Sequence, residues 1–368
     1  MKAKAVIGLG FGDEGKGLVT DYLCSLSQKP LVVRFSGGHQ AGHTVVLNEN
    51  KHVFSNFGSG TLQKAPTFWM KYCTIDPVGL FNEYYEILNK TAIIPVIWMD
   101  KNCPVTTPFD KKFNENNYKN GSVGVGFGAT IDREKAMYSL KLIDLFYKDI
   151  FYEKLKQISN YYKLNVNNEV INNFINCVLD LTEKNYISRV PFIEYSKCYN
   201  YDYIFEGSQG LMLDPEIGFF PNVTRLTTTT KHIRKYNPDL YLVTRAYQTR
   251  HGKGFMTNES IPHNIIEDPN ETNISNKHQG KFRRSLLDLS LIKYAISKDK
   301  YIKEKPSKII VITCLDHIKN DYRFTYKGNI IECKDEYDFL KRIQYILGCR
   351  ILTSNSPESK NIKEFLIQ

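Results

Sequence analysis

Residues 3–17 read AKAVIGLGFGDEGKG, and this stretch decides the fold of the chain. Residues 3–9 form a short apolar run ending in glycines, which predicts a buried strand. Residues 17–26, GLVTDYLCSL, carry apolar side chains at the spacing of a helix. Because a buried strand, a tight loop and a helix follow one another directly, the stretch is typical of the repeating unit of an α/β protein.

Later apolar runs repeat this pattern, and each ends in a glycine or a polar turn. They are residues 31–38 (LVVRFSGG), 92–99 (AIIPVIWM), 201–207 (YDYIFEG), 240–247 (LYLVTRAY) and 308–316 (KIIVITCLD). We therefore predict an α/β fold, a mostly parallel, doubly wound sheet with satellite helices. Ligands of such sheets bind at the carboxyl ends of the strands, where these turns fall.

The chain shows no internal repeat and no linker that would divide it. We expect one domain over residues 1–368, with a mainly helical subregion at about residues 132–200. Residues 257–280 are long, polar and without periodicity. Such a segment is typical of a mobile active-site element or of disorder.

The composition is that of a globular protein, with 42% hydrophobic and 24% charged residues among 368, which excludes a disordered chain. We interpret the net charge of +10 mainly as background composition without a functional meaning. A preference for anionic small molecules is the second interpretation, and nucleic-acid binding is the third. None of the eight cysteines forms a C-x-x-C pair, which argues against a zinc ribbon. Without a run of ~20 apolar residues or a signal peptide, we expect a cytoplasmic protein with reduced thiols and no membrane partner.

Residues 10–17, GFGDEGKG, carry the strongest local signal. Glycines let backbone N–H groups turn towards a phosphate, a helix start adds favourable partial charge, and Lys16 can neutralise phosphate oxygens. The spacing is not that of a standard P-loop, and Asp13 suggests Mg²⁺ binding or removal of a substrate proton. The alternative is a tight turn in which Asp13 caps the helix. The octapeptide alone leaves both interpretations open.

A second loop, residues 37–44 (GGHQAGHT), follows the next buried run. A histidine held at such a turn can act as a general acid near neutral pH. A lone histidine is more often structural, but two glycine-flanked polar loops at consecutive strand ends favour the catalytic interpretation.

These motifs together resemble the adenylosuccinate synthetase family. FGDEGKG and QAGHT match its first two loops, and further matching segments follow in the family's order over nearly the whole chain. They are GSVGVGFGATIDREK (121–135), EGSQGLMLDPEIGFFPNVT (206–224), RAYQTRHGKG (245–254), QGKFRRSLLDL (279–289), TCLD (313–316) and SNSPE (354–358). The resemblance implies a P-loop-NTPase-like fold, a homodimer, and a ligase that joins IMP to L-aspartate.

In that reaction GTP, with Mg²⁺, phosphorylates the 6-oxygen of the purine, and the aspartate amine then displaces the phosphate. Phosphorylation supplies the leaving group that a purine carbonyl lacks, provided that N1–H is removed and the phosphoryl charge is shielded. ATP is the alternative donor.

The resemblance assigns a role to each matching residue. Asp13 is the base and, with the carbonyl of Gly42, the metal ligand; His43 is the acid; Lys16 holds phosphate. The triphosphate contacts Gly12, Glu14, Gly15, Lys16, Gly17, Gly42, His43, Thr44, Asp316, Ser354 and Ser356. The purine nucleotide contacts Asp13, Gln40, Ala41, Ser122, Val123, Gln209, Thr224, His251 and Lys281, and aspartate contacts Gln279, Gly280 and Arg283.

Three departures from the family pattern fall on the 5′-phosphate of the purine nucleotide. Gln40 replaces Asn, Val123 replaces Thr, and Tyr138 replaces an Arg that reaches across the dimer. Compensation could come from the side chains of Ser122, Arg133 or Arg225.

Other departures affect the remaining ligands: Cys314 replaces the Lys of T-K-L-D, Lys281 and Phe282 replace arginines, and His251 replaces an apolar residue. The alternative function is therefore a paralog with another amine donor or another 6-oxopurine, such as dGMP or GMP. The viral branch that makes aminoadenine precursors acts in this way, but its known members lack the Asp of the first loop, which this chain keeps as Asp13.

Other classes of protein fit less well. A descendant without activity would not need Asp13, Lys16 and His43 together, and a signalling GTPase needs a true P-loop. Nucleic-acid binding is not expected, since KHIRKY (231–236) is the best basic stretch and we interpret it as a solvated turn.

Overall fold

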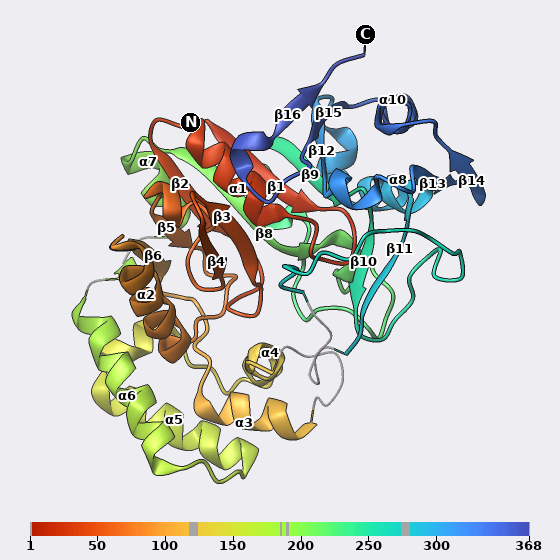
Figure 1. The fold of residues 1–368 in the computed structure, drawn as a ribbon. Coiled ribbons are helices and arrows are strands. Elements are labelled where there is room, and N and C mark those ends of the chain that lie inside the picture. The colour runs from red at the N-terminus through yellow and green to blue at the C-terminus, as the bar shows by residue number, and fades with distance from the viewer. Residues whose placement is uncertain (1, 118–123, 185, 189–190, 274–279, 368) are drawn as a thin grey trace.

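A central sheet of ten strands, mostly parallel, organises the chain (Figure 1). The computed structural model describes residues 2–117, 124–184, 186–188, 191–273 and 280–367. The strand order is β16-β15-β12-β9-β1-β8-β2-β5-β6-β7, and of these described strands only β16 is antiparallel to its neighbour. The strands are β1 Ala3–Gly8, β2 Pro30–Arg34, β5 Thr67–Trp69, β6 Ile97–Asp100, β7 Ile187–Ser188, β8 Asp202–Gly210, β9 Asp239–Arg245, β12 Lys308–Thr313, β15 Arg350–Thr353 and β16 Lys363–Phe365. The prediction of a mostly parallel α/β sheet is confirmed.

Two predicted strand ranges need correction. The run 92–99 enters the sheet only at Ile97, because Ala92 adopts a left-handed conformation at the end of α2 and Pro95 has no N–H to donate. The run 240–247 is split: β9 ends at Arg245, and Tyr247 begins a strand of another sheet.

Two smaller sheets flank the central one. Four strands, in the order β10-β11-β13-β14, form the first: β10 Tyr247–His251, β11 Phe282–Asp288, β13 Arg323–Tyr326 and β14 Asn329–Glu332. The second is a hairpin of β3 His43–Leu47 and β4 Asn50–Phe54.

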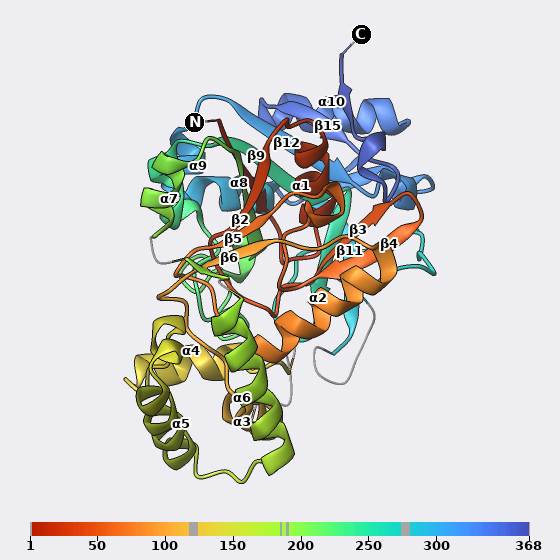
Figure 2. The ribbon, with the colours of Figure 1, turned by 90° about the vertical axis from the view of Figure 1, so that its left-hand side faces the viewer.

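Helices cover both faces of the sheet, and α3 to α6 gather in a lobe at one end of the molecule (Figures 1 and 2). The helices are α1 Lys16–Ser25, α2 Pro77–Thr91, α3 Pro108–Asn117, α4 Phe127–Lys135, α5 Lys148–Tyr162, α6 Asn168–Glu183, α7 Phe192–Cys198, α8 Leu289–Lys298, α9 Lys300–Glu304 and α10 Glu336–Leu347. In the described part of the chain, no helix is both long enough and apolar enough to cross a membrane.

The packing of β1 shows why an unbroken apolar run makes this strand. Ala5 and Ile7 belong to one hydrophobic core, whereas Val6 belongs to another on the opposite face. Successive side chains of a strand point to opposite faces, so a strand buried on both sides must be apolar throughout. A third core fills the helical lobe, where Phe151 and Phe174 pack.

The polar segment 257–280 is irregular over its described part, residues 257–273, but it is held by hydrogen bonds. The Asn264 N–H donates to Asp321 at 2.7 Å, and the Ile266 N–H donates to the His317 carbonyl at 2.8 Å. Ile265 is buried. This part therefore packs on the strands and turns that carry the predicted site.

Candidate active site

The predicted loops meet at the carboxyl ends of three neighbouring strands. The loop at residues 9–15 follows β1, the loop at residues 35–42 follows β2, and β8 lies between these strands with Ser208 and Gln209 near its end. The predicted segment 245–254 joins them, since Arg245 Nε donates to the Asp13 carbonyl at 2.6 Å. Segments that lie far apart in the sequence thus form one site.

The first loop has an unusual backbone. Gly12, Asp13 and Gly15 have φ angles of 95°, 61° and 93°. Glycine tolerates the left-handed region, but a residue with a side chain is disfavoured there by about 1–2 kcal/mol. Something outside the loop must therefore hold Asp13.

Side chains on β9, β10 and β12 hold three consecutive carbonyl groups of this loop. Thr249 Oγ1 donates to the Gly12 carbonyl at 3.2 Å, and Thr313 Oγ1 donates to the Glu14 carbonyl at 2.8 Å. The carbonyl of Asp13, which lies between these two in the chain, accepts the bond from Arg245 Nε. Helix α1 then begins at Lys16 without a side-chain cap, which leaves N–H groups at its start for an anion.

Glu14 faces into the loop. Its Oε1 accepts from the N–H groups of Gly10 (3.1 Å) and Gly12 (2.9 Å), and its Oε2 pairs with Lys16 Nζ at 2.6 Å. Burial would raise the pKa of Glu14, but Lys16 and the Gly12 N–H outweigh it and lower that pKa. The Glu14 side chain thus organises the loop and Lys16 from within.

Asp13 is the more basic carboxylate of the loop. Burial raises its pKa, and the opposing charges of His251, Arg245 and Lys16 do not cancel this effect. The basic side chain beside the Asp13 carboxylate is His251, whose Nε2 lies 3.4 Å from Asp13 Oδ2. A half-buried carboxylate with a raised pKa is suited to accept a proton.

His43 begins β3 and is buried. Its Nδ1 lies 2.7 Å from Glu206 Oε1, and its Nε2 lies 3.3 Å from the Ser208 carbonyl. Burial lowers the pKa of His43, and Glu206 partly offsets this by favouring the protonated ring. Both ring nitrogens face acceptors, so an imidazolium would be hydrogen-bonded on both sides.

Glu206 is a fully buried carboxylate supported by several groups. Ser59 Oγ donates to it, the Ser59 N–H donates at 3.2 Å, and Arg34 Nη1 lies 4.0 Å away. Burial alone would raise the pKa of Glu206, but His43, Arg34 and Ser59 hold it at about 2. The carboxylate is therefore ionised and keeps a proton on His43 Nδ1.

The amide groups predicted to hold the purine nucleotide lack partners. Gln40 is buried, and neither the oxygen nor the nitrogen of its amide has a hydrogen-bond partner in the described structure. The buried Oε1 atom of Gln209 likewise has no hydrogen-bond partner there. Buried polar atoms without partners are rare in proteins, so these atoms are suited to a ligand. His39 Nε2 lies 2.9 Å from the Val125 carbonyl, which brings the start of α4 to this loop.

The residues predicted for the donor base lie after β12 and β15, which are neighbours. The Leu315 N–H donates to the Ser354 carbonyl at 3.2 Å, and Ser354 Oγ donates to the Ser356 carbonyl at 2.7 Å. Asp316 lies in the same turn, with His317 Nε2 at 3.6 Å from its Oδ2. On the side of the first loop, Thr44 Oγ1 lies 2.8 Å from Thr272 Oγ1.

The segment predicted to bind aspartate lies beside β10. The Gly252 N–H donates to the Lys281 carbonyl at 2.8 Å, and a side chain at Gly280 would lie 3.1 Å from Gly252 Cα. Arg283 Nη1 pairs with Glu259 at 2.6 Å. Ser122, Val123 and Gln279 lie outside the described residues. Thr224 is placed by its N–H, which donates to the Leu213 carbonyl at 2.8 Å.

The two arginines considered as replacements for the cross-subunit Arg differ. Arg133 is fully buried and donates to Asp110 at 2.8 Å and to the Val105 carbonyl at 2.8 Å, so its guanidinium is committed to the core of the lobe. Arg225 is partly exposed and pairs with Asp132 at 3.2 Å. Tyr138 packs on Tyr161, with ring centroids 4.4 Å apart.

Comparison with known proteins gives the family. The model of the family "adenylosuccinate synthetase" matches residues 5–348. This chain belongs to the adenylosuccinate synthetase family.

Curated relatives agree with this assignment. The adenylosuccinate synthetase of Thermosipho africanus is 31% identical over 98% of this chain and 92% of its own length. That of Thermoplasma acidophilum is 29% identical over 90% of this chain and 81% of its own.

Two solved structures share the fold. The fully ligated adenylosuccinate synthetase of Plasmodium falciparum matches with a TM-score of 0.77, 18% identity and full coverage of both chains. The cyanophage S-2L succinoaminodeoxyadenylate synthetase, solved with dGMP and with dATP as an energy donor, matches with a TM-score of 0.63 and 16% identity, over 99% of this chain and 96% of that chain.

Sequence reasoning for this adenylosuccinate synthetase family member missed four residues of the site: Glu206, Ser59, Arg34 and Arg245. Glu206 and Arg245 stand in the quoted motifs EGSQG and RAYQTRHGKG, so each motif marked the segment without giving the role. Arg34 ends a strand, and Ser59 has no motif of its own. Only the contacts of the folded chain reveal these two.

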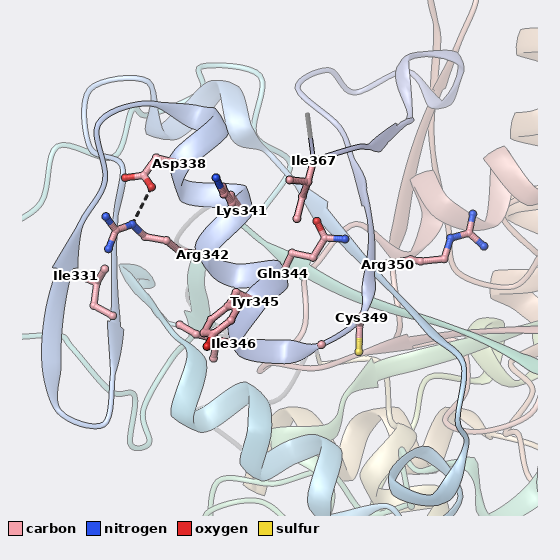
Figure 3. A pocket seen from close by; sticks show the side chains of 11 residues that line it. Ile331, Asp338, Lys341, Arg342, Gln344, Tyr345, Ile346, Cys349, Arg350 and Ile367 are labelled. Atoms are coloured by element: carbon pink, nitrogen blue, oxygen red, sulfur yellow. Dashed lines mark hydrogen bonds and ion pairs between the residues drawn. The ribbon is translucent and has the colours of Figure 1, made fainter.

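The large surface groove of this family member lies elsewhere. A groove of about 890 Å³ is lined by α10 with parts of β14, β15 and the C-terminal segment, including Lys341, Tyr345 and Ile367 (Figure 3). None of the residues predicted for the site lines it.

Proposed function

We propose that this protein catalyses the GTP-dependent joining of IMP and L-aspartate to give adenylosuccinate, GDP and phosphate. One observation carries the proposal. Asp13, whose carboxylate this chemistry needs, lies on the loop that follows β1, and its backbone carbonyl is held by the buried Arg245. His43, whose imidazole it needs, begins β3 directly after the loop that follows β2, and its ring pairs with the buried Glu206.

Asp13 would accept the N1 proton of the purine, since burial raises its basicity. The negative charge then moves to the 6-oxygen, which attacks the terminal phosphoryl group of the donor. His43 would donate a hydrogen bond from Nε2 to the 6-oxygen, with Glu206 supporting the protonated ring. In the second step the same bond would stabilise phosphate as the aspartate amine displaces it.

Lys16 and the N–H groups at the start of α1 would bind the donor phosphates. An ammonium group has three donors, so Lys16 can keep its bond to Glu14 and still reach phosphate. The carboxylate of Asp13 and the carbonyl of Gly42 are oxygen donors of the kind that Mg²⁺ prefers. Within the described structure, the half-buried Asp13 carboxylate has no full counter-charge in hydrogen-bond contact. Mg²⁺, when bound there, shields the charge of the phosphoryl group.

Asp316 would accept two N–H donors from the guanine edge of GTP, which favours GTP over ATP. Arg283, with Gln279 and Gly280, is proposed to receive the aspartate carboxylates. Gln40, Ala41, Gln209, Thr224, His251 and Lys281 are proposed to hold IMP together with Ser122 and Val123. The protein is proposed to act as a homodimer in the cytoplasm. Sedimentation of the purified protein tests whether it is a dimer.

A guanine nucleotide is the second candidate for the purine substrate. The longer Gln40 with its unpartnered amide favours a changed phosphate or base contact, and the cyanophage structure with dGMP has the same fold. Retention of Asp13 favours IMP.

The test is phosphate release by the purified protein with Mg²⁺, L-aspartate and GTP, with IMP, dGMP or GMP as the purine. ATP then replaces GTP. Turnover with IMP and GTP is the expected result. Turnover with dGMP alone would assign the second candidate, and no turnover with any combination would refute the ligase proposal.

A further inference from the structure

Arg245 is buried at the end of β9 and contacts three different parts of the site. Its Nε donates to the Asp13 carbonyl at 2.6 Å. Its Nη1 donates to Tyr247 Oη and to Glu271 Oε2, both at 2.7 Å. A guanidinium group is a rigid fork, so its bonds fix the relative positions of their acceptors.

The bond to Asp13 acts where the backbone is strained. Asp13 has a φ of 61°, and the side chains that hold the two carbonyls beside its own are the neutral hydroxyl groups of Thr249 and Thr313. A charged donor makes a stronger hydrogen bond than a hydroxyl does. Arg245 is therefore the main contact that keeps this peptide in its unfavourable conformation.

The other arm of Arg245 leads to the turn that carries Asp316. Tyr247 Oη lies 2.8 Å from His317 Nδ1, and His317 Nε2 lies 3.6 Å from Asp316. A continuous line of polar contacts thus joins the backbone of Asp13 to the turn that follows β12.

We infer that Arg245 is a positioning residue for the ligase reaction: it fixes the Asp13 backbone in the left-handed conformation and ties it to the Tyr247–His317 pair of the donor-base turn. The inference rests on the proposed role of Asp13 as the base. It predicts that loss of Arg245 impairs the chemical step more than the binding of nucleotides, because the loop amides and α1 remain in place.

The test compares Arg245→Met with Arg245→Lys, Glu271→Gln and Thr249→Val. Steady-state kinetics give kcat and the KM for each substrate, calorimetry gives the Kd for Mg²⁺–GDP, and thermal melts show that each variant is folded. Misplacing a catalytic group by about 1 Å can cost ~100-fold in rate, so Arg245→Met should lose ~30–100-fold in kcat with KM and Kd within about threefold.

The matched variants separate positioning from a merely structural role. Arg245→Lys can still donate to the Asp13 carbonyl, so its kcat should be about tenfold or more above that of Arg245→Met. Thr249→Val removes only a neutral hydrogen bond to the same loop, and Glu271→Gln leaves the bond from Arg245 to Asp13 in place, so each should lose less kcat than Arg245→Met does. A kcat per folded site in Arg245→Met that equals the wild-type value would overturn the inference, and so would equal losses in the Lys and Met variants.

A crystal structure of Arg245→Met distinguishes failure of this inference from failure of the proposed function. If the wild-type protein shows no ligase turnover, the proposed function is wrong. In that case the structure of the variant still tests the inference about the backbone. The inference is supported if residue 13 leaves the left-handed region in the variant and refuted if it does not.

Discussion

Replacing Glu206 by glutamine should lower the pH above which the enzyme loses activity. Glu206 is ionised and lies 2.7 Å from His43 Nδ1. Its charge favours the imidazolium form of His43, which the proposed mechanism requires, whereas burial opposes that form. A glutamine at this position would keep an acceptor for Nδ1–H but remove the charge, so the pKa of His43 must fall and activity must fade at a lower pH.

The size of this effect follows from the geometry. The charge centres of a carboxylate and an imidazolium in this contact are about 4 Å apart, which corresponds to ~4 kcal/mol at an effective dielectric constant of ~20. That energy corresponds to a change of about three in pKa. Glutamine keeps part of the hydrogen bond to His43. Arg34, which lies 4.0 Å from the Glu206 carboxylate in the wild type, remains beside this side chain. We therefore expect the pKa of His43 to fall in Glu206→Gln, but by less than the full charge–charge energy would give.

The assay is kcat for phosphate release between about pH 6 and about pH 9 at saturating substrates. On the alkaline side, kcat should be approximately tenfold lower for every decrease of about one in the pKa of His43, whereas at the acid end the two enzymes should converge. The control is Ser59→Ala, which removes a hydrogen bond to Glu206 but leaves its charge. A Glu206→Gln enzyme with the wild-type pH profile would refute the argument.

The remaining predictions concern catalysis, stability and their pH dependence. His43→Asn should abolish turnover while the Kd for Mg²⁺–GDP stays within about threefold, and a near-normal rate would contradict the acid role. Arg133→Met should lower the free energy of unfolding in urea by about 3–5 kcal/mol, because the buried Asp110 loses its charged partner; a loss under about 1 kcal/mol would contradict this. The depressed pKa of Glu206, about 2 against an ordinary 4.5, stabilises the fold above about pH 4.5, and this contribution is lost as the pH falls towards 2. The difference in Tm between wild type and Glu206→Gln should shrink over that range, and a constant difference would argue against the depressed pKa.

The sheet was largely predictable from the sequence, because a strand buried on both faces must be apolar throughout. The run at residues 3–9 became β1, and the run at residues 201–207 falls mostly within β8. The run at residues 92–99 was only partly a strand, because local backbone constraints at Ala92 and Pro95 override apolar character.

The site was predictable to the level of its loops but not of its internal contacts. Asp13, Lys16 and His43 stand in motifs whose residue types suggest their chemistry. The sequence does not reveal which residues pair with them, because His43 and Glu206 are separated by 163 positions and Arg245 and Asp13 by 232. The role of the Glu14 side chain was also not predictable: Glu14 was assigned to the phosphate cradle, whose contacts are backbone N–H groups, and its side chain binds the loop amides and Lys16.

The place of β1 in the sheet has a consequence for how the protein folds. This strand lies between β8 and β9, which end at residues 210 and 245, and the carbonyls of the loop that follows it are anchored by side chains as distant as Thr313. Contacts between such distant segments form late, since a long stretch of chain must be ordered first. Until β8 and β9 are in place, β1 is an apolar strand without neighbours. An unpaired apolar strand can pair with other molecules, so the folding chain is open to aggregation until residues 202–245 are ordered.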